Sequence, residues 1–247
     1  MNIKKYLDST YLKTPKQAGV SEKETKQNVK DLINEAIKNS FYLVMIRPEY
    51  VKMARKMIDK AGADVKVGTV IGFHEGTLNY KLKLAEAQKA INDGVDELDY
   101  VVNYELFKQG EVDLIKKEVF EGSLLGIKNG KVVKWIIEVA ALNNEQIAQL
   151  SALIHDVVVQ SIGPQHANKV FVKSSTGFYK TEGGKPNGAT PESIKIMAKY
   201  ANPLPIKAAG GVRNYNEAVE MIKLGVTRIG TSSAKAIAEG KEAEGGY

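Results

Sequence analysis

Eight short apolar segments alternate with longer segments of helical spacing along the whole chain. The short segments are apolar on nearly every residue, as expected of strands that are covered on both faces in a parallel sheet. Because strand and helix alternate without a break that resembles a linker, the order predicts one parallel α/β domain. The expected strands span residues 4–7, 41–46, 65–71, 97–102, 132–140, 170–173, 204–208 and 227–230.

Each of these segments is followed by a stretch with helical periodicity. Ser21 and Glu24 form the pattern of a capping box, and Pro48 and Pro191 stand where helices are expected to begin. The expected helices span residues 21–38, 48–60, 79–92, 112–127, 144–159, 191–200 and 214–224, with a final short helix opened by Ser232.

The count of strand–helix units and the length of 247 residues favour a closed TIM (β/α)8 barrel over residues 1–238. Residues 239–247 are rich in glycine and glutamate and are expected to form a flexible tail. The alternative is a doubly wound open sheet. It is disfavoured because no Gly-x-Gly-x-x-Gly motif follows the first strand.

The charge pattern argues against a nucleic-acid partner. The net charge is +6, but the basic residues are nearly all lysines, are spread over every expected helix and are interleaved with acidic residues. Such a pattern is typical of a solvated surface. The most apolar segment, 135–142, is too short for a membrane span and is interrupted by Glu138.

The cysteine and histidine content excludes several kinds of catalytic or structural site. The chain has no cysteine, which excludes disulfides and a cysteine nucleophile and fits a cytoplasmic location. His74, His155 and His166 are far apart and lack metal-ligand spacing, so no metal is expected.

Lys173 is the residue on which the functional interpretation depends. It ends the apolar segment Phe171-Val172-Lys173, and burying an ammonium without a partner is unfavourable. Burial or a nearby cation lowers the pKa of the amine, and a neutral amine can attack a carbonyl. Lys207 has a similar setting in Ile206-Lys207-Ala208.

A barrel would bring these lysines together with acidic residues at the carboxyl ends of its strands. Lys207 beside Lys173 would depress the pKa of Lys173, and Asp99 could move protons. The alternative is that these charged residues have no catalytic role and only form ion pairs with one another around the rim of the barrel. The candidates from five different strands are Asp8, Asp99, Glu138, Lys173 and Lys207.

A phosphate site is expected near the last strands. Barrel enzymes often hold phosphate through the loops after strands seven and eight, together with a helix N-terminus. The residues that could present backbone N–H groups or positive charge there are Gly177, Gly210, Gly211, Arg213, Ser232 and Ser233.

The chain resembles the deoxyribose-phosphate aldolases, a class I (Schiff-base) aldolase family on the TIM barrel. The resemblance covers nearly the whole chain. Its most specific segments are 171–178 (FVKSSTGF), 207–211 (KAAGG) and 228–233 (RIGTSS), and it also includes 7–10, 70–73, 96–99 and 134–138.

The resemblance implies reversible cleavage of 2-deoxy-D-ribose 5-phosphate to D-glyceraldehyde 3-phosphate and acetaldehyde, in deoxyribonucleotide catabolism and without a cofactor. It implies that Lys173 forms the Schiff base, that Lys207 perturbs its pKa and that Asp99 relays protons with a water. Asp8 would help to hold Lys207, and Lys134 would belong to the polar network. The resemblance further implies that the glycines and serines named above bind the substrate phosphate.

Some members of the family use a C-terminal tyrosine as a proton carrier, and this chain ends in Tyr247 after two glycines. The resemblance also allows a homodimer.

The sequence departs from the family pattern at several positions, which bear on substrate preference and rate. Ser9 stands where histidine is common, His74 where proline is usual and Ser174 where threonine is common. Met45 lies near a position often held by cysteine, and Pro186-Asn187 lie in a longer loop. Two other functions stay open: another Schiff-base sugar-phosphate aldolase or transaldolase, and a phosphate-binding barrel that has lost catalysis.

Overall fold

The computed structural model describes residues 1–241 and contains a closed barrel of eight parallel strands. Each strand pairs with its neighbours in chain order, and β8 closes the barrel against β1. The predicted TIM barrel is therefore confirmed. The strands are β1 (Leu7–Tyr11), β2 (Leu43–Ile46), β3 (Lys66–Ile71), β4 (Glu97–Val101), β5 (Val132–Ile136), β6 (Val170–Lys173), β7 (Ile206–Ala209) and β8 (Val226–Thr231).

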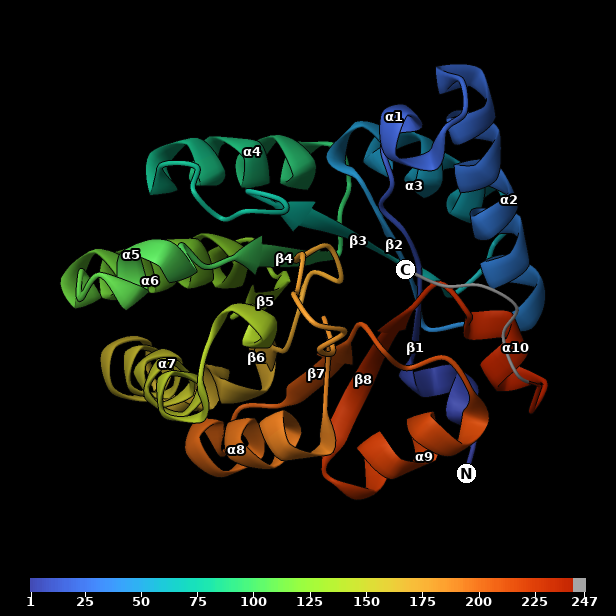
Figure 1. Ribbon diagram of the computed structural model, residues 1–247. Coiled ribbons are helices and arrows are strands. Elements are labelled where there is room, and N and C mark those ends of the chain that lie inside the picture. Colours follow the sequence, from blue (N-terminus) through green and yellow to red (C-terminus); the bar gives the residue numbers. More distant parts are fainter. Residues whose placement is uncertain (242–247) are drawn as a thin grey trace.

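The helices form a ring around the barrel (Figure 1). The capping box predicted at Ser21 and Glu24 is present at the start of α2. The helices are α1 (Pro15–Ala18), α2 (Glu22–Asn39), α3 (Val51–Lys60), α4 (Tyr80–Asn92), α5 (Tyr104–Lys108), α6 (Val112–Lys128), α7 (Asn144–Asp156), α8 (Pro191–Ala201), α9 (Tyr215–Lys223) and α10 (Ala234–Ala238). Shorter 3₁₀ or π segments are η1 (Ile3–Tyr6), η2 (Pro48–Tyr50), η3 (Val139–Ala141), η4 (Val157–Ile162) and η5 (Pro164–Lys169).

The strands have two different faces, although both are buried. Leu98 and Tyr100 of β4 belong to the apolar core between barrel and helices, as does Trp135 of β5. Successive side chains on a strand point to opposite faces. Glu97 and Asp99 therefore point into the barrel, and burial on both sides explains why the pattern does not alternate between exposed and buried.

Two expected strands are wrong in their bounds by more than two residues, whereas the bounds of the others differ from the observed ones by at most two. Residues 4–6 form part of the 3₁₀ segment η1, and the first strand runs from Leu7 to Tyr11 instead of ending at residue 7. The reason is that Asp8, Ser9 and Thr10 are polar residues of a buried strand, so apolar periodicity places the strand too early. The fifth strand ends at Ile136, four residues before the expected end, because Glu138 adopts a left-handed backbone conformation with φ 57°.

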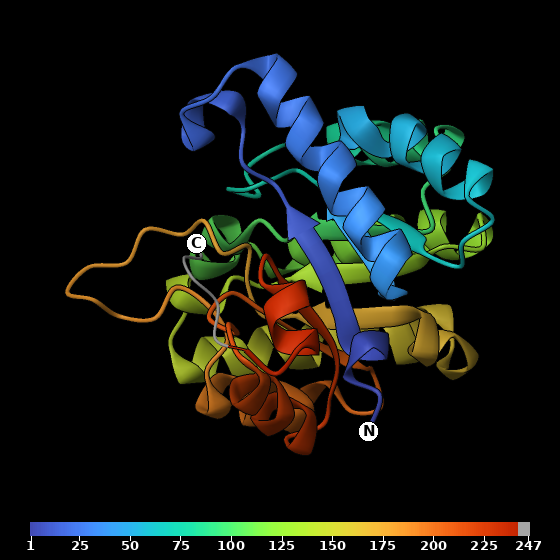
Figure 2. The ribbon, with the colours of Figure 1, turned by 90° about the vertical axis from the view of Figure 1, so that its right-hand side faces the viewer.

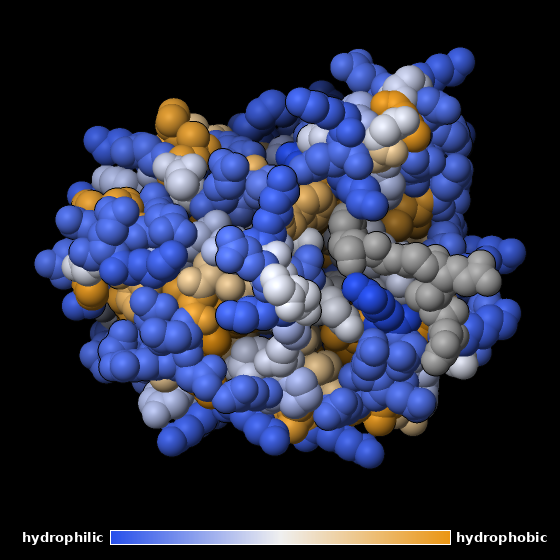
Figure 3. Space-filling view, in the orientation of Figure 1, coloured by the Kyte–Doolittle hydropathy of each residue, from blue (hydrophilic) through white to orange (hydrophobic). Residues whose placement is uncertain are grey.

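The loop that joins β6 to α8 projects from the barrel (Figure 2, orange, at left). The loops that follow the other strands lie at the same end of the barrel, where parallel strands terminate together. Hydrophilic side chains cover most of the face seen in Figure 3. Within residues 1–241, no helix combines the length and apolar character needed to cross a membrane.

Candidate active site

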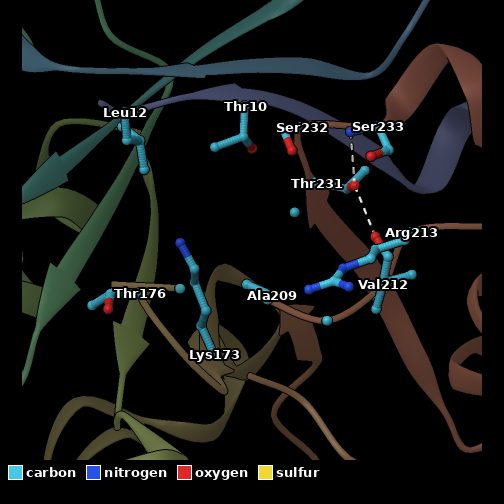
Figure 4. A pocket seen from close by; sticks show the side chains of 14 residues that line it. Thr10, Leu12, Lys173, Thr176, Ala209, Val212, Arg213, Thr231, Ser232 and Ser233 are labelled. Atoms are coloured by element: carbon cyan, nitrogen blue, oxygen red, sulfur yellow. Dashed lines mark hydrogen bonds between the residues drawn. The ribbon is translucent and has the colours of Figure 1, made fainter. Parts of the chain in front are cut away.

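Lys173 is the last residue of β6, and its side chain points into a pocket (Figure 4). The residue is only 3% exposed. Its Nζ lies 2.8 Å from Oδ2 of Asp99, to which it donates a hydrogen bond. The amine therefore has one carboxylate partner on its inner side and the pocket on the other.

Burial is the main cause of an altered pKa at Lys173. It lowers the pKa of the amine from 10.5 to about 8, against the opposing attraction of Asp99. Repulsion from Lys207 contributes to the lowering, as the sequence predicts, but it is a smaller cause than burial. A substantial fraction of the amine is therefore neutral near pH 8, and a neutral amine is nucleophilic.

Asp99, in the middle of β4, connects three ammonium groups. Its Oδ2 accepts hydrogen bonds from Lys173 and from Lys207 (2.9 Å), and its Oδ1 accepts one from Lys134 (2.8 Å). Burial by itself would raise the pKa of Asp99, but the three lysines together hold it well below its usual value. Asp99 is therefore a carboxylate at neutral pH.

Strand register explains why these residues meet. Lys173 and Lys207 are directly paired across β6 and β7, and Asp99 and Lys134 are directly paired across β4 and β5. Side chains at paired positions on parallel strands point to the same face of a sheet. Residues that are far apart in the sequence thus converge inside the barrel.

A second layer of charges lies deeper, below Asp99. Lys207 contacts Oδ2 of Asp8 at 2.6 Å, and the guanidinium of Arg228 donates to Oδ1 of Asp8. Arg228 also donates to Glu97 (3.0 Å), and Lys134 contacts the other oxygen of Glu97 at 2.5 Å. All five of these side chains are buried.

Glu97 and Arg228 also belong to this network, and the sequence by itself assigns neither of them a role. The available signal was a charged residue inside an apolar strand, the same signal that identified Lys173. The candidate residues were expected at the carboxyl ends of their strands. Asp8, Asp99 and Lys207 instead lie within their strands, and Glu138 lies beyond the end of β5. Only Lys173 is the final residue of its strand.

All six residues expected to bind phosphate line the pocket that Lys173 enters. The space between the lining residues, counted together with the solvent at the open mouth, is about 500 Å³. Gly210 shows why glycine is required, since its φ is 74° and a Cβ there would lie 2.9 Å from the Cα of Gly188. The pocket residues are Thr10, Leu12, Lys173, Thr176, Gly177, Ala209, Gly210, Gly211, Val212, Arg213, Gly230, Thr231, Ser232 and Ser233.

One detail of the expected phosphate site differs. The backbone N–H of Ser233 donates to Oγ1 of Thr231 at 3.0 Å, and that hydroxyl donates to the carbonyl of Val212 (Figure 4). The N–H of Ser233 is thus already used inside the protein. The side chains of Ser232 and Arg213 point toward the pocket in the same view.

The departures from the family pattern lie around the site. Ser9 is buried in β1, and Met45 packs with apolar residues inside the barrel. The Ser174 hydroxyl exchanges hydrogen bonds with the backbone of Ala209. The ring of His74 stacks on Phe178 with centroids 5.5 Å apart. Tyr247 lies outside the described residues.

Comparison with known proteins gives a consistent result. Residues 6–238 match the sequence model of the DeoC/LacD family of aldolases. The chain is 39% identical over 241 residues to the deoxyribose-phosphate aldolase of Thermococcus gammatolerans, which covers 97% of this chain and 96% of the relative. It is 36% identical to the deoxyribose-phosphate aldolase of Streptococcus gordonii over 100% of both chains.

Solved structures agree with the fold. The aldolase QR15 superimposes with a TM-score of 0.79 at 32% identity, covering 97% of this chain and 95% of that one. The tetrameric deoxyribose phosphate aldolase of Aeropyrum pernix superimposes with a TM-score of 0.77 at 29% identity, covering 96% of this chain and 89% of that one.

Proposed function

The chain belongs to the DeoC/LacD family of aldolases, and we propose that it acts as a deoxyribose-phosphate aldolase. The reaction is the reversible cleavage of 2-deoxy-D-ribose 5-phosphate to D-glyceraldehyde 3-phosphate and acetaldehyde. One observation carries the proposal: a buried lysine with a lowered pKa faces a pocket lined by glycine backbone, serines and Arg213.

In the proposed mechanism the neutral amine of Lys173 attacks the aldehyde carbon of the open-chain sugar. Loss of water from the carbinolamine gives a protonated imine, which accepts the electron pair of the C2–C3 bond when the C3 hydroxyl loses its proton. Glyceraldehyde 3-phosphate leaves, and the remaining enamine takes up a proton at carbon. Hydrolysis of the resulting imine releases acetaldehyde and the free lysine.

The surrounding charges suit these steps. Asp99 stays anionic because of its lysine partners, so its negative charge stabilises the positive imine. We assign it the relay of protons through a water, as the family resemblance implies. Lys134 and Lys207 donate to Asp99 and orient it toward Lys173. Asp8 holds Lys207 from below. The steps proposed here require no metal or organic cofactor.

We propose that the phosphate of the substrate lies against Gly177, Gly210 and Gly211 and near Arg213, Ser232 and Ser233. Support comes from their shared pocket and from the positive φ of all three glycines, which turns the backbone in ways that side chains would resist. A dianion binds well where backbone N–H groups and a guanidinium converge.

The decisive experiment is borohydride trapping with acetaldehyde, followed by peptide mapping. An ethyl adduct on Lys173 is expected, whereas an adduct on a different lysine would move the nucleophile. A folded protein that binds phosphate without forming any adduct would favour the barrel that has lost catalysis. Comparing the cleavage of deoxyribose and ribose 5-phosphates separates the proposed activity from another sugar-phosphate aldolase.

Several expectations from the sequence stay predictions. They are the proton-carrying role of Tyr247, the boundary between a barrel of residues 1–238 and a tail of 239–247, the cytoplasmic location, the absence of a nucleic-acid partner and the homodimer. Because the Aeropyrum pernix relative is a tetramer, measuring the mass in solution is the direct test of assembly.

A further inference from the structure

Glu138 is a buried carboxylic acid to which the mechanism above gives no role. It is 1% exposed and lies just beyond the end of β5. Its backbone is left-handed, with φ 57°, a conformation that is unfavourable for residues other than glycine. A side chain kept in such a position calls for a functional explanation.

The contacts of Glu138 lead directly to the segment that follows Lys173. On either side of Glu138, the N–H of Ile137 donates to the carbonyl of Lys173 (3.0 Å) and that of Val139 to the carbonyl of Ser174 (2.9 Å). The carboxylate Oε2 accepts both the N–H (3.1 Å) and the hydroxyl of Thr176.

Thr176, which Glu138 holds through these two hydrogen bonds, also forms part of the pocket wall. Its hydroxyl accepts the N–H of Phe178 at 3.0 Å, and Thr176 and Gly177 both line the pocket. The carbonyl of Gly177 accepts a hydrogen bond from Asn187 at 3.3 Å. Within residues 1–241 the N–H of Gly177 donates no hydrogen bond, so it is available to a ligand.

We propose that Glu138 is a positioning residue for the substrate phosphate: its carboxylate holds Thr176 and Gly177 so that the Gly177 N–H faces the pocket. The inference rests on the proposed function, because it assumes that the phosphate occupies this pocket. Charge-assisted hydrogen bonds to the carboxylate are stronger than neutral ones and fix geometry accordingly. A wall that is ordered before binding loses less conformational entropy when the phosphate arrives.

The charged and titratable groups around Glu138 are compatible with this role. Lys173 of β6 interacts with its carboxylate, and Glu138 in turn acts on the Tyr104 hydroxyl of α5. Burial raises the pKa of Glu138 to about 7, while the hydrogen bonds from Thr176 oppose that rise. Those two hydrogen bonds therefore favour the carboxylate form that holds the loop.

Two variants separate positioning from a general structural role. Glu138→Gly removes the carboxylate and suits the left-handed backbone, so this variant should stay folded. We expect it to raise KM for deoxyribose 5-phosphate and to weaken inhibition by inorganic phosphate, each about tenfold, a change of ~1.4 kcal/mol. The value of kcat and the trapping of acetaldehyde on Lys173 should stay within about twofold. Glu138→Gln keeps an oxygen acceptor for Thr176 but removes the charge, so its KM should lie between those of Glu138→Gly and wild type.

Glu86→Ala is the matched control. Glu86 accepts the backbone N–H of Gly72 (2.8 Å) just after β3 and does not line the pocket, so KM and phosphate inhibition should not change. The inference is overturned if Glu138→Gly leaves KM unchanged, or if it lowers trapping as much as it weakens phosphate binding. If the wild-type protein neither traps acetaldehyde nor cleaves the sugar, the proposed function fails. Calorimetric titration of wild type and Glu138→Gly with inorganic phosphate then still decides the role of Glu138.

Discussion

Lys173 lies where its own positive charge is unfavourable, and this is the physical basis for proposing it as the nucleophile. At 3% exposure it has lost nearly all contact with water, and its pKa falls to about 8 although Asp99 is a direct partner. The same desolvation that favours the neutral amine reduces the stability of the fold, because below pH 8 the buried amine is forced to carry a proton.

Replacing Lys173 by methionine should abolish turnover and stabilise the protein. Between pH 8 and 10.5, Lys173 takes up a proton when the protein unfolds. The destabilisation that its buried charge causes is therefore complete below pH 8 and disappears as the pH rises to 10.5. The difference of the two pKa values corresponds to at most about 3 kcal/mol. Urea unfolding of both proteins at pH 7 and pH 10 measures it. A methionine variant that is less stable than wild type at pH 7 would contradict the assignment.

Burial shifts the pKa of Glu138 in the other direction: it raises the pKa of this acid from 4.5 to about 7, whereas it lowers that of the base Lys173. Its contribution to stability is complete below pH 4.5 and is lost as the pH rises through about 7. The Glu138→Gln variant should therefore gain stability relative to wild type between those values, by on the order of 3 kcal/mol at most. Thermal unfolding at pH 5 and pH 8 tests this, and a difference that is constant with pH would disprove it.

Among the secondary-structure elements, α4 and α6 are joined by a buried ion pair outside the barrel strands. Lys83 of α4 contacts the carboxylate of Glu118 of α6 and donates to the carbonyl of Val101 at 2.6 Å. The other oxygen of Glu118 accepts the N–H of Asn103 at 3.1 Å. The pair thus attaches two helices to the end of β4, the strand that carries Asp99.

Breaking this pair from one side should be much more destabilising than removing both partners. Lys83→Met leaves an unpaired buried carboxylate and should lower the free energy of unfolding by about 3–5 kcal/mol. The double variant Lys83→Met/Glu118→Leu should recover most of that loss. Urea denaturation of the single and double variants gives the coupling energy, and simple additivity of the two single changes would refute the interpretation.

At the scale of the whole molecule, the barrel interior contains a nearly balanced set of charges. Within the described chain its upper and lower layers hold Lys134, Lys173, Lys207 and Arg228 against Asp8, Glu97 and Asp99. Cations exceed carboxylates by one, so the set becomes neutral when a single base loses its proton. Lys173, next to the pocket, has a pKa lowered to about 8 by burial.

Removing a carboxylate from this set should make Lys173 still easier to deprotonate. In Glu97→Gln, Lys134 loses its closest carboxylate and interacts more strongly with Asp99. The attraction between Asp99 and the ammonium of Lys173, which raises the pKa of Lys173, then becomes weaker. The acidic limb of the pH profile for borohydride trapping should move to lower pH. Glu22→Gln, the same charge change on the exposed face of α2, is the control and should leave the profile unchanged. An unmoved profile in Glu97→Gln would show that the lower layer does not act on the nucleophile.

The sequence alone was sufficient for the order of elements, the barrel and the family, and it singled out Lys173 as the proposed nucleophile. These depend on local information: apolar segments covered on both faces, helix caps, and a charged residue in an apolar strand. The family comparisons confirm the fold and the aldolase function, while the roles of individual residues stay predictions.

Only the tertiary structure decided how the charges are arranged. Closure and register of the barrel place Lys207 beside Lys173 and Lys134 beside Asp99, and they bring Glu97 and Arg228 into the same network. The connection from Glu138 to Thr176 likewise depends on a backbone turn after β5 that no local pattern announces. The physical reason is that desolvation and ion pairing depend on distances across the barrel, whereas strand and helix formation depend on neighbours along the chain.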